Sequence, residues 1–169
     1  MAKLRKSMSK VNLTLPDDAE LLKAVGRVAL AHGQLELMLR MTIKTLSRLT
    51  VNEAMNATEK WKNWELRVEI EKLFRAKTND PSLRLKVKAL MGQSEHLSDR
   101  RNELLHGAFA ITNDGSVVAK GADDKWGPPP EPEVFKKLAD DIGVLVNDLN
   151  EARLRGFIRQ VCEEAEAKA

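Results

Sequence analysis

Two long stretches of this sequence place mostly apolar side chains alternately four and three residues apart, over 21–49 and 83–104. Because an α-helix turns once in about 3.6 residues, this spacing brings all of these positions to one helix face. Each stretch therefore predicts a long helix with one buried face. The first stripe contains Leu21, Val25, Val28, His32, Leu35, Leu39, Thr42, Leu46 and Leu49, and the second contains Leu83, Val87, Leu90, Ser94, Leu97, Arg101 and Leu104.

Two further segments complete a helical bundle in this prediction. A helix over about 58–77 follows a break at 50–57, and a final helix runs from about 133 to the C-terminus. Hydrophobic residues make up 43% of the chain but aromatic residues only 4%, which suits a core of aliphatic side chains packed between helices. We therefore expect a mostly α fold, an up-and-down bundle of four to five helices.

A short β-hairpin is predicted over about 108–120, before the C-terminal helix. Phe109 and Ile111 alternate with smaller residues, and a turn signal over 113–115 separates this strand from a second one. The segment 121–132, which contains three successive prolines, is expected to be an extended loop. Residues 15–169 then form a single domain.

The first ten residues carry four basic side chains, Lys3, Arg5, Lys6 and Lys10. They are either a solvated, disordered start to the chain or a flexible arm that touches phosphates. We expect residues 1–14 to be a disordered basic arm. The whole chain has a formal charge of only +3, so bulk charge alone does not indicate a nucleic-acid binder, and any such site must be local.

The chain has one cysteine, Cys162, which excludes an internal disulfide and a zinc site built from several cysteines. No run of 18 apolar residues occurs, and no apolar segment follows the basic start as it does in a secretory signal. We therefore expect a cytoplasmic protein with no membrane span. No cluster of metal ligands is evident, and no cofactor is predicted.

The segment 101–107, RNELLHG, contains the residues best suited to chemistry. Arg101 lies in the middle of an apolar stripe, where an unpaired guanidinium is costly, so it either forms a buried ion pair, reaches to the helix edge or serves a functional site. His106 lies before Gly107, which is placed to close the helix. A histidine there either interacts with the helix dipole or transfers protons near neutral pH. Asn102 lies four residues before His106 and can orient it.

Arg101, Asn102 and His106, near the end of a long helix, resemble the RNxxxH motif of the HEPN superfamily, the higher eukaryotes and prokaryotes nucleotide-binding domain. The order of long helices, motif, glycine and further helix is also similar to bacterial members, with the hairpin and proline loop as additions. The resemblance implies a metal-independent ribonuclease in which the RNA 2′-hydroxyl attacks the adjacent phosphate and leaves a cyclic phosphate. His106 would transfer protons, Arg101 would stabilise the phosphate and Asn102 would orient.

The resemblance also implies a homodimer, because one chain offers one histidine of this motif and a two-fold axis would supply the second. Positions 101 and 106 differ by about 140° around a regular helix, so the two side chains do not share a face. For Arg101 and His106 to reach one site, the last helical turn must unwind, the arginine side chain must bend across, or the two groups must meet between chains. A toxin or defence role, with a cognate antitoxin protein as partner, is part of this hypothesis. The alternatives are a non-catalytic HEPN-like module that binds nucleotide, RNA or protein, and a plain helical bundle.

Other residues are secondary candidates. Arg100 also precedes His106 at a spacing that the looser family pattern admits. On the first stripe, His32 is interpreted as an interior histidine bonded to Glu36, with lining of the same site as the alternative. Glu36 is a candidate because helical members of the superfamily often carry an acidic residue on the first long helix. His96 is expected at the surface, and Cys162 is expected to be inert packing.

Overall fold

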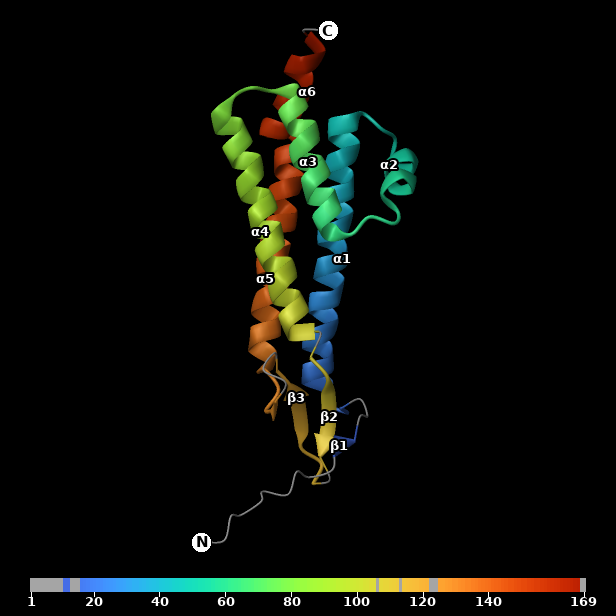
Figure 1. The fold of residues 1–169 in the computed structure, drawn as a ribbon, viewed down its shortest axis with the longest axis vertical. Coiled ribbons are helices and arrows are strands. Elements are labelled where there is room, and N and C mark those ends of the chain that lie inside the picture. Colours follow the sequence, from blue (N-terminus) through green and yellow to red (C-terminus); the bar gives the residue numbers. More distant parts are fainter. Residues whose placement is uncertain (1–10, 13–15, 106, 113, 122–124, 168–169) are drawn as a thin grey trace.

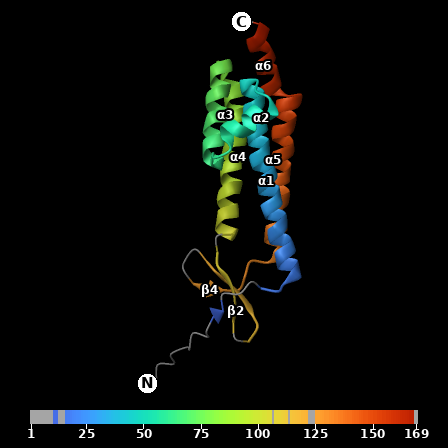
Figure 2. The same ribbon diagram turned by 90° about the vertical axis from the view of Figure 1, so that its right-hand side faces the viewer.

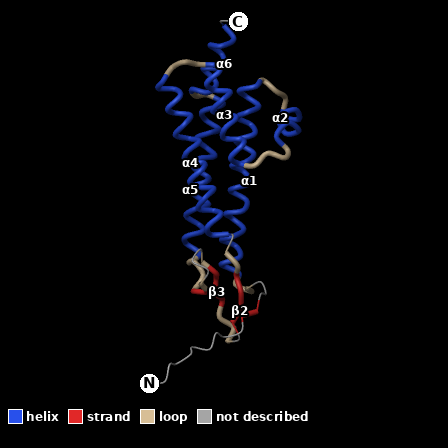
Figure 3. The backbone as a smooth tube through the Cα atoms, viewed as in Figure 1, coloured by secondary structure: helices blue, strands red, loops and turns tan. Residues whose placement is uncertain are grey.

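The computed structural model describes residues 11–12, 16–105, 107–112, 114–121 and 125–167 (Figure 1). Four long helices form a bundle: α1 (Ala19–Ser47), α3 (Asn63–Lys77), α4 (Pro81–Leu105) and α5 (Pro132–Leu154). Two shorter helices, α2 (Val51–Thr58) and α6 (Phe157–Ala167), flank it. A small sheet lies at one end of the bundle, so helices and strands are separated in space (Figures 2 and 3). The prediction of a mostly helical bundle with a small β insertion is confirmed.

The helix directions depart from a simple up-and-down course at one connection. Arg27 contacts Asp140 and Met38 contacts Arg153, so α1 and α5 run the same way. The contacts of Arg67 with Glu95 and of Arg84 with the Arg75 carbonyl make α3 and α4 antiparallel. Figure 1 shows α1 and α3 also running in the same direction, because α2 and its loops carry the chain back along the bundle.

The helix α2 occupies the segment predicted as a break, and that prediction was wrong. Thr50 and Glu53 form a capping box: the Thr50 hydroxyl accepts from the Glu53 N–H, and the Glu53 carboxylate accepts from the Thr50 N–H at 2.8 Å. Such reciprocal capping satisfies backbone donors that a helix start leaves unpaired. The T-x-x-E pattern was therefore a helix start signal that the periodicity argument missed.

The C-terminal helix is also divided, where a single helix was predicted. The helix α5 ends at Leu154, and the Arg155 and Gly156 N–H groups both donate to the Glu151 carbonyl, at 3.0 and 2.9 Å. A Cβ at position 156 would lie 3.0 Å from the Ala152 Cα, which favours glycine at this close turn. The chain then resumes as α6, which packs on the ends of α1 and α3.

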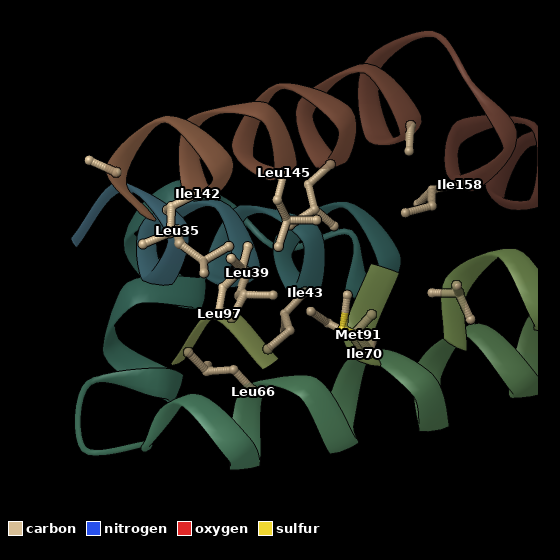
Figure 4. Packing of buried hydrophobic residues seen from close by; sticks show 14 of the residues in the cluster. Leu35, Leu39, Ile43, Leu66, Ile70, Met91, Leu97, Ile142, Leu145 and Ile158 are labelled. Atoms are coloured by element: carbon tan, nitrogen blue, oxygen red, sulfur yellow. The ribbon is translucent and has the colours of Figure 1, made fainter. Parts of the chain in front are cut away.

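The core runs along the bundle axis and is almost entirely aliphatic (Figure 4). Leu35, Leu39, Leu66, Leu97 and Ile142 come together there from four helices, all at most 4% exposed. Burial of each such side chain contributes about 1.5–3 kcal/mol. No described helix combines the length and apolar character needed to cross a bilayer.

The predicted hairpin is present as β2 (Phe109–Thr112) and β3 (Val117–Lys120), with Phe109 opposite Ala119. Two short strands extend it to an antiparallel sheet of order β1-β2-β3-β4. β1 (Val11–Asn12) belongs to the segment predicted to be a disordered arm, and that prediction was wrong for these two residues because they pair with β2. β4 (Trp126–Gly127) lies within the predicted proline loop, which is therefore not extended loop throughout. Residues 1–10 lie outside the described residues.

Candidate functional site

The motif helix α4 ends at Leu105, directly above the sheet. After it, the backbone of Gly107 approaches β3 closely: a Cβ at position 107 would lie 2.9 Å from the Lys120 carbonyl oxygen. Real Cβ atoms do not approach so closely, so glycine is required here. The Lys120 N–H also donates to the Ala108 carbonyl at 2.8 Å. The sheet thus holds the end of the motif against β3.

Arg101 lies on the packing face of α4 and is half-buried. One terminal nitrogen, Nη1, donates to Asn102 Oδ1 at 3.0 Å, and its Nε is buried without a hydrogen-bond partner. Among the described residues, no carboxylate lies within ion-pairing distance of this guanidinium. Of the alternatives for Arg101, the buried ion pair is therefore not found in the described part of the chain.

His32, Glu36 and Arg40 follow one another on α1, each one helical turn after the last. His32 Nδ1 lies 3.8 Å from the Glu36 carboxylate, and Arg40 lies 3.6 Å from its other oxygen. His32 and Glu36 are thus neighbours, but their separation is longer than a hydrogen bond, so the predicted bond between them is not formed. Arg40 is a further neighbour of Glu36 that was not predicted. Its position four residues after Glu36 and eight after His32 was the signal that would have found it.

His32 is an uncharged neighbour for Arg101. Burial lowers the pKa of His32, the Glu36 carboxylate raises it, and the Arg101 guanidinium lowers it further. The last effect places His32 and Arg101 within electrostatic reach of each other across the α1–α4 contact. At neutral pH the imidazole is neutral, so one of its nitrogens is able to accept a hydrogen bond and the other is able to donate one.

Six buried polar atoms of the described residues have no hydrogen-bond partner, and all lie on α1, α3 or α4. Buried polar groups are normally paired, and each exception calls for a reason such as a water, an ion or a ligand. Arg101 and His32 both belong to this group. We call these residues the unpaired set: His32, Arg40, Asn63, Ser94, Ser98 and Arg101.

Arg100 has a different environment from its neighbour. It lies 3.9 Å from the Asp141 carboxylate of α5, which also accepts from Lys137 at 2.9 Å. Adjacent helical positions differ by about 100°, which explains why one arginine meets α5 while the other lies beside α1. The structure brings Arg101, Asn102, His32 and Glu36 into one region and directs Arg100 elsewhere.

The remaining predicted residues are easily placed. Asn102 is exposed beside Arg101, and His106 lies outside the described residues. His96 is exposed, as predicted. Cys162 is buried with its Sγ 3.8 Å from the Thr45 carbonyl, and burial raises the pKa of this thiol, which makes it a poor nucleophile. No cluster of three or more metal-ligating His, Cys, Asp or Glu side chains occurs in the described part of the chain.

Comparison of the chain with protein-family models, with curated proteins and with solved structures found no match.

Proposed function

We propose that this protein is a metal-independent endoribonuclease of HEPN type. The observation that carries the proposal is Arg101: a half-buried guanidinium in the middle of a packing face, with a buried unpaired Nε and no described carboxylate partner. An incompletely paired guanidinium in such surroundings lowers the stability of the fold, and no described ion pair compensates for this loss. Its fork of donors matches the oxygens of a phosphodiester, which supplies the missing negative charge.

The reaction would need proton transfer and stabilisation of charge, and no metal. The 2′-hydroxyl oxygen bonds to the adjacent phosphorus as its proton passes to a base, and the bond to the 5′-oxygen breaks as that oxygen takes a proton. The products are a 2′,3′-cyclic phosphate and a 5′-hydroxyl. In this proposal His106 transfers a proton and Arg101 stabilises the negative charge on the phosphate oxygens. Asn102 orients the reacting groups.

A homodimer belongs to the proposal because in-line transfer uses both an acid and a base. A two-fold axis near the end of α4 would bring a second His106 to the same phosphate. His32 adds a neutral imidazole close to Arg101, and Glu36, which also contacts Arg40, lies 3.8 Å from this imidazole on the same helix. A role as a toxin or defence component, paired with a cognate antitoxin protein, is the setting we propose for such an activity.

The test is cleavage of mixed RNA in EDTA by the wild-type protein and two variants, Arg101→Ala and His106→Ala. We expect the wild type to cleave and each variant to lose roughly two orders of magnitude or more in rate, the scale of a lost charge-stabilising or proton-transfer group. Arg75→Ala is the matched control, since Arg75 is an exposed arginine of α3 paired with Glu71. It should cleave like wild type.

Circular dichroism and light scattering of each variant separate loss of chemistry from loss of folding or assembly. If Arg101→Ala and His106→Ala remain folded and cleave as fast as the wild type, the nuclease proposal is wrong. If no RNA is cleaved but RNA binds in an Arg101-dependent way, the non-catalytic HEPN-like binding module is the correct alternative.

A further inference from the structure

A pocket of about 370 Å³ lies between the end of α4 and the sheet. Glu103 and Gly107 border it from the motif segment, and Phe109, Lys120, Lys125 and Trp126 border it from the sheet. Its volume falls within the range of about 300–1,000 Å³ that is typical of small-molecule sites. It is built by the two short additions to the fold, the hairpin and β4, and none of the six residues of the unpaired set lines it.

The sheet register places an aromatic ring beside one lysine of this pocket, and a second lysine borders the pocket from the loop before β4. Trp126 of β4 is directly opposite Lys120 of β3, and directly opposed residues project from the same face of a sheet. Lys125 precedes Trp126 in the chain. Trp126 and Lys120 are half-buried and Lys125 is exposed. An aromatic surface flanked by lysines is the arrangement that proteins use to stack bases and to attract the phosphates of single-stranded nucleic acids.

Arg101 does not line the pocket, whereas Glu103 and Leu104 do. They follow Arg101 by two and three residues, about 200° and 300° around a helix, so the pocket extends from the side of α4 opposite Arg101 to within about 60° of it. A ligand in the pocket is therefore next to the end of the motif helix but not on the guanidinium. A polynucleotide that crosses the end of α4 can occupy both places at once, whereas a single phosphate cannot.

We propose that this pocket binds one nucleotide of a single-stranded RNA, next to the cleaved phosphodiester. The base stacks on Trp126, and Lys120 and Lys125 attract the adjoining phosphate. The exposed carboxylate of Glu103 accepts a hydrogen bond from a base amino group or a ribose hydroxyl. The inference rests on the proposed function for its substrate, and it assigns to the sheet the selection of the nucleotide beside the cut.

The test measures binding of a fluorescent 2′-O-methyl oligoribonucleotide to the full-length protein by anisotropy. This probe lacks the attacking hydroxyl, so it is bound and not cleaved. Trp126→Ala should weaken binding roughly 10-fold, in line with the loss of one stacked base. Trp64→Ala is the matched control, because Trp64 is a tryptophan of α3 that is 55% exposed and does not line this pocket. It should bind like wild type.

Lys125→Glu provides a second variant in case Trp126→Ala disturbs the sheet. Lys125 is exposed, and its replacement by an acidic residue should weaken binding at low salt, with circular dichroism as the check that the variant is folded. Equal binding by wild type and folded Lys125→Glu and Trp126→Ala would overturn the inference, as would an absence of binding by the wild type. Trp126-dependent binding without any RNA cleavage would support the pocket and reject the nuclease proposal. RNA cleavage by the wild type, with the same RNA affinity in the wild type and in the two pocket variants, would support the nuclease proposal and reject the pocket.

Discussion

The two sides of α1 make different kinds of contact. Toward α5, α1 packs along most of its length with aliphatic side chains, and none of the buried polar atoms described as unpaired lies on α5 or α6. The same helix also carries His32, Glu36 and Arg40, and His32 lies within electrostatic reach of Arg101 on α4, a helix that also carries Ser94 and Ser98. The packing against α5 stabilises the fold, whereas the polar groups of α1 and α4 include buried atoms that have no hydrogen-bond partner among the described residues.

This contrast separates residues that stabilise the fold from residues that are candidates for function. A buried polar atom without a partner costs about 1–3 kcal/mol, so several in one region oppose folding. The cost is explained if a phosphate and water satisfy these groups when substrate is bound. The two sides of α1 should therefore respond in opposite ways to substitution by apolar residues.

The largest expected effect is on the apolar side. Leu145→Ala, in a fully buried position of α5, should lower the free energy of unfolding by about 2–5 kcal/mol, through lost transfer energy and a cavity. Urea titration followed by circular dichroism measures this change. Leu30→Ala, at a position 74% exposed, is the control and should change the stability by less than about 0.5 kcal/mol.

On the polar side, Arg101→Met should leave stability unchanged or raise it by up to about 1 kcal/mol, because an incompletely paired guanidinium is replaced by an apolar chain. The same titration applies. Arg153→Met is the comparison on α5, where the arginine donates to Asn150 at 2.7 Å, and it should lower stability. A large loss in Arg101→Met would mean that Arg101 has a structural partner.

The next expected effect depends on pH. Burial lowers the pKa of His32 from its ordinary value of 6.5, so in weak acid the unfolded chain binds a proton that the folded protein does not. This stabilising contribution is complete above pH 6.5 and is lost as the pH falls toward the lowered folded pKa. His32→Asn should flatten the decline in stability with acidification. Exposed His96→Asn should leave the slope as in the wild type.

The smallest expected effect concerns single hydroxyls. Ser94→Ala removes a buried, unpaired oxygen and should keep stability constant or raise it by a few tenths of a kcal/mol. Thr58→Val is the matched comparison, since the buried Thr58 hydroxyl donates to the Ala54 carbonyl at 2.7 Å. That variant should lose about 1 kcal/mol. Similar losses in both variants would show that Ser94 has a partner after all.

Much of the fold was predictable because its long helices carry regular apolar stripes. Leu35 and Leu39 on the first stripe, and Leu97 on the second, are all in the core. What escaped prediction was local. The capping box at Thr50 starts a helix of eight residues, too short for a stripe, and the close turn at Gly156 divides a helix whose stripe continues past it.

The site was predictable only in part. The motif spacing singled out Arg101 and Asn102, and the contact of His32 with Glu36 followed from their separation by one turn. The environment of Arg101 was not predictable, because which side chain of α1 lies beside it depends on how two helices pack. The pocket at Trp126 was also missed, since it depends on the pairing of a two-residue strand that carries no periodic signal.

The most direct measurement is the chemistry of the RNA ends produced in EDTA, read by mass spectrometry. We predict 2′,3′-cyclic phosphate and 5′-hydroxyl termini from the wild-type protein. We predict no such products from Arg101→Met when this variant is as stable as the wild type. Termini bearing a 3′-hydroxyl and a 5′-phosphate, or equal amounts of cyclic phosphate from Arg101→Met, would contradict the proposal.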